Sequence, residues 1–114
     1  MRQARWHIEN PVDCPLVAAI NIVGGKWKPI ILHILGTRSM RFGELQRSIP
    51  PVSQKMLTQQ LRELEADGIV ERRVHDGKPL RTDYSLTALG ASLWPVLQTL
   101  YDWGQQLVEH KAAA

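Results

Sequence analysis

The feature that most constrains the fold is a pair of short predicted helices separated by two prolines and followed by a hairpin. It lies within residues 37–90, and its central text is RFGELQRSIPPVSQKMLTQQLRELEADGIVERRVHDGKPLRTDYSLT. Pro51 forces Pro50 into an extended conformation, so one helix cannot continue through both. The first helix is therefore predicted over Arg41–Ser48, and the second from Ser53, a good N-cap residue, to about Asp67.

Two strands are predicted directly after the second helix. Residues 69–75 and 81–86 alternate between apolar and polar side chains, and Asp76-Gly77 is a turn sequence between them. Two helices joined by a tight turn and followed by a two-stranded hairpin make a winged helix-turn-helix, which places one helix in a DNA groove and the hairpin beside it. The predicted fold class is mainly α with a small β-wing (α+β).

Further helices are predicted on both sides of this motif. One opens at Cys14-Pro15 and runs to about Val23, and another spans residues 26–35. Thr87 is expected to cap a long final helix whose apolar positions form one stripe. The 114 residues are expected to form one domain. Its parts would be an N-terminal arm at 1–13, the helix-turn-helix at 41–67, the wing at 69–86 and a dimerisation helix at 87–109.

The charge is unevenly distributed along the chain. The net charge is only +3, but residues 26–62 hold seven basic side chains against one acid, Glu44. The exposed face of the helix that follows Ser53 is cationic and rich in amides, and its carboxylates are held back to the C-terminal end, where they oppose the helix dipole. Keeping carboxylates away from phosphates explains that arrangement, so the basic block favours a polyanionic partner. The alternative is an ordinary solvated surface.

Several classes of protein are disfavoured. No apolar stretch reaches the ~20 residues that span a bilayer, and the N-terminus lacks an apolar signal core. A single cysteine permits no internal disulfide, which indicates a reducing, cytoplasmic location. There is no glycine-rich phosphate loop, and the four histidines lack metal-ligand spacing. We therefore expect no cofactor, no metal, no membrane partner and no enzymatic activity.

From Cys14 to Gly104 the chain resembles the HxlR-type winged helix-turn-helix transcriptional regulators, a MarR-like family. The resemblance is carried by Cys14-Pro15, GGKW (24–27), RFGEL (41–45), SQKMLTQQLRELEADGIV (53–70), YSLT (84–87), and WPVL with Tyr101, Trp103 and Gly104. It implies a homodimeric, sequence-specific DNA-binding regulator whose subunits pair through their N-terminal and C-terminal helices. The alternative, from another class, is a winged-helix module that contacts only proteins.

The expected DNA contacts fall into three groups. The helix after Ser53 supplies readers of base edges and backbone, because glutamine pairs with adenine, whereas lysine and arginine prefer guanine. Two arginines of the first helix, with the amides at its start, are expected to hold phosphates and set the register. The wing adds cations, with Lys78 near its tip, and alternation lets at most one of Arg72 and Arg73 touch DNA. The candidate DNA-binding residues are Arg41, Arg47, Ser53, Gln54, Lys55, Thr58, Gln59, Arg62, Arg73, Lys78 and Arg81.

Three questions stay open at the level of sequence. The start of a helix favours the thiolate of Cys14 while Asp13 opposes it, and some members of the resembled family sense oxidants or electrophiles through the matching cysteine. Cys14 is otherwise a packing residue at a dimer interface.

His75 is either an exposed histidine or a pH-sensitive phosphate contact. Four aromatic side chains either pack in the core and the dimer or line a cavity for a small-molecule effector: Trp27, Trp94, Tyr101 and Trp103. The operator is expected to be an inverted repeat in double-stranded DNA. No pattern in the sequence specifies its bases, the regulated genes or the sign of regulation.

Overall fold

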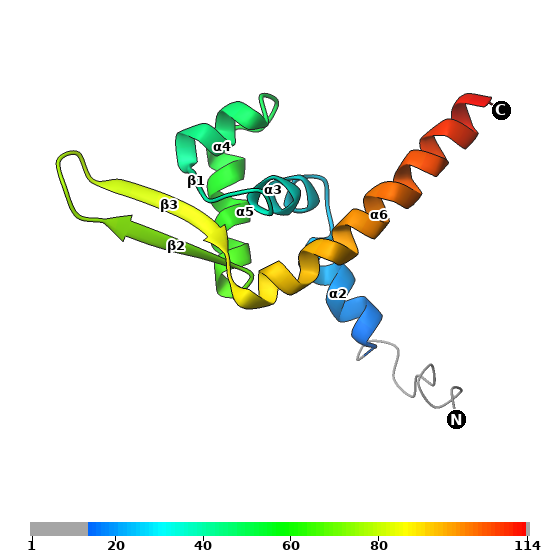
Figure 1. Ribbon diagram of the computed structural model, residues 1–114, viewed down its shortest axis with the longest axis horizontal. Helices are drawn as coiled ribbons and strands as arrows, with labels where there is room; N and C mark the ends of the chain where they lie inside the picture. The colour runs from blue at the N-terminus through cyan, green and yellow to red at the C-terminus, as the bar shows by residue number, and fades with distance from the viewer. Residues whose placement is uncertain (1–13, 114) are drawn as a thin grey trace.

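The computed structural model describes residues 14–113, so the arm predicted at 1–13 lies outside the described residues. The chain is mainly helical with one small antiparallel sheet (Figure 1), which confirms the predicted fold class. In chain order the elements are α2 (Pro15–Val23), α3 (Trp27–Leu35), β1 (Met40–Arg41), α4 (Phe42–Ser48), α5 (Gln54–Ala66), β2 (Val70–His75), β3 (Arg81–Leu86) and α6 (Ala88–Ala113).

The wing is part of a three-stranded sheet rather than the two-stranded hairpin predicted. The strand order is β1-β3-β2, and β1 pairs antiparallel with β3 through Met40 opposite Tyr84 and Arg41 opposite Asp83. A strand of two residues is too short to produce an alternating pattern, which is why the sequence did not reveal it. Arg41 consequently lies in a strand and caps α4, so the first helix of the motif is attached to the wing by backbone pairing.

The turn between α4 and α5 forms as the prolines require. The Val52 N–H donates to the Ile49 carbonyl at 2.9 Å, and the Ser53 hydroxyl oxygen accepts from the Met56 N–H at 3.0 Å. Ser53 is therefore the N-cap of α5. Three leucines on one side of α5 face the core, where they meet α3, α4 and the base of the wing. The largest fully buried side chains are Ile31, Leu32, Leu45, Leu57, Leu61 and Leu64.

Thr87 joins the wing to α6. Its hydroxyl donates to the Gly68 carbonyl at 2.6 Å and accepts from the Gly90 N–H at 3.1 Å, as expected of an N-cap. The helix runs to Ala113, beyond the predicted end at Glu109, and extends away from the other elements (Figure 1). Its apolar stripe is consequently only partly covered within one chain, because Leu97 is buried while Leu100 is 53% exposed.

Candidate nucleic-acid interface

One face of α5 gathers all five predicted readers. A hollow of about 740 Å³ runs along this face, and its lining residues are Gln54, Lys55, Thr58, Gln59, Arg62 and Glu63. Thr58 is half-buried, while the other four readers are exposed. The spacing that turns three leucines into the core turns these amides and cations outward. The arrangement offers hydrogen-bond donors and acceptors along a helix whose apolar side is fully committed to packing.

Glu63 closes the C-terminal end of this face and is held by a buried lysine. The Lys28 Nζ lies 2.6 Å from a Glu63 carboxylate oxygen, and the Gln59 amide nitrogen donates to the other oxygen at 3.2 Å. These two hydrogen bonds, from Lys28 first, lower the pKa of the Glu63 carboxyl below its ordinary value of 4.5. Lys28 is only 8% exposed. Lys28 therefore does not contribute to an exposed basic surface, and the count of cations in the basic block overstated that surface.

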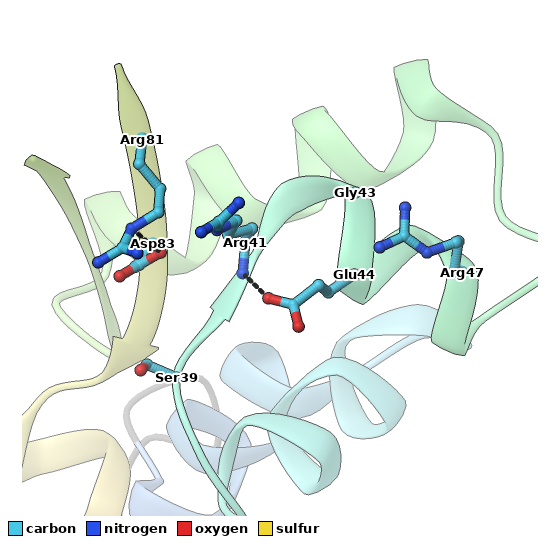
Figure 2. A pocket seen from close by; sticks show the side chains of 7 residues that line it. All are labelled: Ser39, Arg41, Gly43, Glu44, Arg47, Arg81 and Asp83. Atoms are coloured by element: carbon cyan, nitrogen blue, oxygen red, sulfur yellow. Dashed lines mark hydrogen bonds and ion pairs between the residues drawn. The ribbon is translucent and has the colours of Figure 1, made fainter. Parts of the chain in front are cut away.

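A second hollow, of about 540 Å³, lies between α4 and the wing. Figure 2 shows three arginines around it: Arg41 at the start of α4, Arg47 near the end of α4, and Arg81 on β3. The pairing of β1 with β3 is what brings Arg41 to the same side as Arg81. The structure thus places three of the predicted DNA-binding residues around one cavity, although they come from separate parts of the sequence.

Two carboxylates share that hollow, and sequence reasoning missed both. The Arg41 N–H donates to Glu44 at 3.0 Å (Figure 2), and this bond is the first cause that lowers the pKa of the Glu44 carboxyl. The N–H of the N-cap residue Arg41 is therefore occupied, while the expectation that the amides at the start of α4 help to hold a phosphate stays a prediction. An acid three residues after an N-cap is the spacing of a capping box and could have revealed Glu44. Asp83 lies 3.7 Å from Arg81, two residues earlier on the same strand, so alternation could have placed both on one face, while its place opposite Arg41 follows from the strand register.

The cations of the wing are exposed and partly paired. Arg73 lies 3.3 Å from Glu71 of its own strand, whereas Arg72 lies 4.0 Å from Glu65 of α5, so the two guanidinium groups have partners on different elements. Exposed ion pairs of this kind contribute little to stability, so these arginines can readily exchange their carboxylate partners for other anions. Lys78 is exposed in the turn between β2 and β3.

His75 has a defined partner and is not a freely exposed histidine. Its Nε2 lies 2.9 Å from the Asp83 carboxylate across the β2–β3 pair, and the side chain is 37% exposed. The same carboxylate lies beside Arg81. A phosphate that binds His75 would therefore have to displace the carboxylate of Asp83 from the His75 ring.

The four aromatic residues do not line a common cavity. Trp94 packs on the end of α3, where its indole N–H donates to the His33 carbonyl at 3.1 Å. The His33 ring stacks between the rings of Trp94 and Tyr101, as expected of a packing residue. Trp103 is 58% exposed. An apolar hollow of about 370 Å³ does lie between α3 and α6, and its lining is Val23, Pro29, Ile30, His33, Leu97, Leu100 and Tyr101.

Cys14 occupies the N-cap position of α2 and is half-buried, with no hydrogen bond from its side chain to the helix. Within residues 14–113, no group of three histidine, cysteine or acidic side chains is placed to hold a metal ion. Over the same residues, no helix has the length and apolar character needed to cross a membrane.

Three features define a class of transcriptional regulator: a helix-turn-helix with a wing, an outward-facing surface of amides and cations on its second helix, and a C-terminal helix whose apolar stripe is only partly covered. Residues 22–112 match the model of the HxlR-like helix-turn-helix family, so the chain belongs to that family. The HTH-type transcriptional regulator YdeP of Bacillus subtilis (strain 168) is 44% identical over 110 residues, covering 93% of this chain and 86% of YdeP. The resemblance of the sequence to HxlR-type regulators is thereby confirmed.

Solved structures agree with this assignment. The redox regulator HypR in its reduced form is 39% identical and superposes with a TM-score of 0.83, covering 89% of this chain and all of HypR. The reduced form of the transcriptional regulator YodB from B. subtilis is 39% identical, with a TM-score of 0.75, and covers 82% of this chain and 92% of YodB. YodB has also been solved after diamide treatment and with bound quinone.

Proposed function

We propose that this HxlR-like regulator is a cytoplasmic homodimer that binds double-stranded DNA in a sequence-specific way, and that the chain works as one domain. The observation that carries the proposal is the exposed face of α5, where amides and cations line one hollow and the leucines of the helix are buried beneath it. An α-helix with such a face fits the major groove, in which each base pair presents a distinct pattern of donors and acceptors.

The proposed division of labour follows the elements. The base readers are the exposed polar residues of α5: Gln54, Lys55, Thr58, Gln59 and Arg62. The arginines around the hollow between α4 and the wing hold backbone phosphates, and Lys78 does so from the wing tip, assisted by Arg73. Ser53 shapes the start of α5 because its hydroxyl is used in the cap, so its contribution to DNA binding is through position.

The proposed dimer rests on apolar surface that one chain leaves uncovered. No side chain of α2, all of which the structure describes, is buried, and Leu16 and Ile20 are more than half exposed. The far half of α6 adds Trp103 and Val108, also more than half exposed. Two-fold pairing through these helices would supply two recognition helices, and hence an inverted-repeat operator whose half-sites are about 10 base pairs apart or a multiple of that.

Cys14 is proposed as a redox-responsive residue. Two observations support it: the chain resembles the redox regulator HypR, and Cys14 lies half-buried at the N-cap of α2. Because it is the single cysteine, oxidation gives a sulfenic acid, a mixed disulfide with a small thiol, or a bridge between two subunits. Each product would alter the N-terminal helix near the proposed dimer contact.

The experiment that tests DNA recognition begins with selection of an operator from a random duplex library by the wild-type protein. Gln59→Ala should weaken binding to this operator by about 1–3 kcal/mol and leave binding to random DNA nearly unchanged. Lys78→Ala should weaken binding to both and make the salt dependence shallower. Identical profiles for the two variants would refute the division into readers and backbone contacts. Failure to enrich any sequence would favour the protein-interaction alternative.

A further inference from the structure

Lys28 is an unusual residue for its position. It lies in the first turn of α3, where the helix dipole disfavours a cation, and it is buried. A buried ammonium is costly unless it is paired, and its partner is Glu63 on α5 at 2.6 Å. The pair therefore connects the supporting helix α3 to the recognition helix α5, with its lysine side chain 11% exposed and its carboxylate side chain 43% exposed at the recognition face.

Glu63 in turn fixes the direction of a base reader. Lys28 holds one oxygen of its carboxylate in place and lowers the pKa of the carboxyl, and an ionised carboxylate can only accept hydrogen bonds. The Gln59 side chain must therefore turn its NH₂ group toward Glu63, and it does so at 3.2 Å. The carbonyl oxygen is therefore the end of the Gln59 amide that Glu63 does not hold, on an exposed side chain that lines the hollow along the recognition face.

Gln54 provides a contrast on the same helix. It lines the same hollow and is exposed, but its amide has no hydrogen-bond partner among the described residues. Its two ends remain interchangeable, so it can present either a donor or an acceptor to a base. Only at Gln59 does a charge decide which end of the amide is held.

We propose that Lys28 and Glu63 are positioning residues that set the base preference of Gln59, and that Gln59 reads a base with an exocyclic amino group in the major groove, adenine or cytosine. The carbonyl oxygen that Glu63 does not hold accepts from adenine N6 or cytosine N4, and the second amide hydrogen stays available for adenine N7. Guanine presents two acceptors at this edge and thymine one, and each would face the Gln59 oxygen unfavourably. This inference rests on the proposed sequence-specific DNA binding.

The test uses the operator that the wild-type protein selects. The position that Gln59 reads is the one at which Gln59→Ala removes the base preference, and operators carrying each of the four bases there are then titrated. The wild type should prefer adenine or cytosine over guanine by about tenfold. The double variant Lys28→Met/Glu63→Gln removes both charges without leaving one buried and unpaired, so the fold should be retained. Its preference at that position should fall to about twofold or less, because a neutral amide at 63 can orient Gln59 either way.

Two controls separate positioning from a general structural effect. Lys28→Arg keeps the cation and should keep the preference. The preference at the position read by Gln54 should be unchanged in the double variant.

If the double variant keeps the full preference, or loses preference equally at every position, the inference is overturned while the proposed function stands. A preference for guanine or thymine in the wild type would also overturn it. If the wild type selects no sequence at all, the proposed function fails, and this inference fails with it.

Discussion

At the scale of single residues, two carboxyl groups should make the stability of the fold depend on pH. Both Glu63 and Glu44 have a pKa below the ordinary 4.5, held there chiefly by Lys28 and by the Arg41 N–H respectively. A carboxyl whose pKa is lowered on folding stabilises the fold above the unfolded pKa, and that contribution is lost as the pH falls through the folded pKa. The melting temperature of the wild type should therefore decrease as the pH falls below about 4.5.

The measurement is thermal unfolding followed by circular dichroism between pH 7 and pH 3. In Glu44→Gln, and in Lys28→Met/Glu63→Gln, the drop should be smaller than in the wild type because one titrating carboxyl has been removed from each. A drop of the same size in all three proteins would assign the acid sensitivity to other groups.

Cys14 carries the second prediction at this scale. Operator affinity of the wild type should shift after diamide or peroxide and return after a reductant, because oxidation alters the start of α2. Cys14→Ser should bind with a fixed affinity under all three conditions. Equal responses of the two proteins, or no response in either, would leave Cys14 as a packing residue and turn attention to the apolar hollow between α3 and α6.

Residues whose role depends on their own helix could be predicted, and residues whose role depends on a distant partner could not. The period of α5 places its leucines inward and Gln59 outward, and the structure has them so. Lys28 was counted as an exposed cation because nothing local to it reveals Glu63, a residue on another helix. The hollow around Arg41 and Arg81 likewise depends on strand pairing that no local pattern encodes.

At the scale of elements, two glycines in the helical region should respond oppositely to alanine. A methyl group at Gly36, the C-cap of α3, would collide with the indole nitrogen of Trp94, whose hydrogen bond to His33 anchors α6 on α3. Gly36→Ala should cost about 1–3 kcal/mol through this overpacking. At Gly43, inside α4, the methyl group meets only the flexible end of Arg47 at 3.3 Å. Gly43→Ala should stabilise by up to about 1 kcal/mol through helix propensity.

Urea unfolding of the wild type and the two variants measures both effects. Destabilisation by Gly43→Ala, or tolerance of Gly36→Ala, would mean that α4 or the contact between α3 and α6 differs from the structure described.

The elements themselves follow from local rules where those rules are strong. Proline spacing and the Ser53 cap fix the boundary between α4 and α5, and Asp76-Gly77 fixes the hairpin. The two residues of β1 are too few to show a period, and the predicted end of α6 is too early because its last turn has no large apolar side chain to extend the stripe. The strand β1 is defined by its pairing with β3, and the end of α6 is defined by the helical backbone rather than by an apolar pattern.

At the scale of the whole molecule, the large exposed apolar side chains of the described residues divide into a set on α2, α3 and α6 and two on the wing, Val74 and Leu80. Leu100 of α6 is 53% exposed and Val74 of β2 is 52% exposed, so as isolated side chains they would be equivalent. They differ in their neighbourhood, since Leu100 lines an apolar hollow beside the exposed face of α6, whereas Val74 lies on a strand between the polar residues Arg73 and His75. Only the first surface resembles a subunit interface, in which apolar side chains are contiguous.

The chain of 12.9 kDa should therefore sediment with twice that mass at micromolar concentration, with or without DNA. Leu100→Glu should convert it to a monomer, because the carboxylate would be buried without a partner in the interface. The monomer should bind a single half-site but lose the added affinity for the complete inverted repeat. Val74→Glu, the matched control, should remain a dimer with unchanged mass. The masses of the three proteins are measured by analytical ultracentrifugation. A monomeric wild type would show that there is no dimer interface, and identical masses for both variants would place the interface away from Leu100.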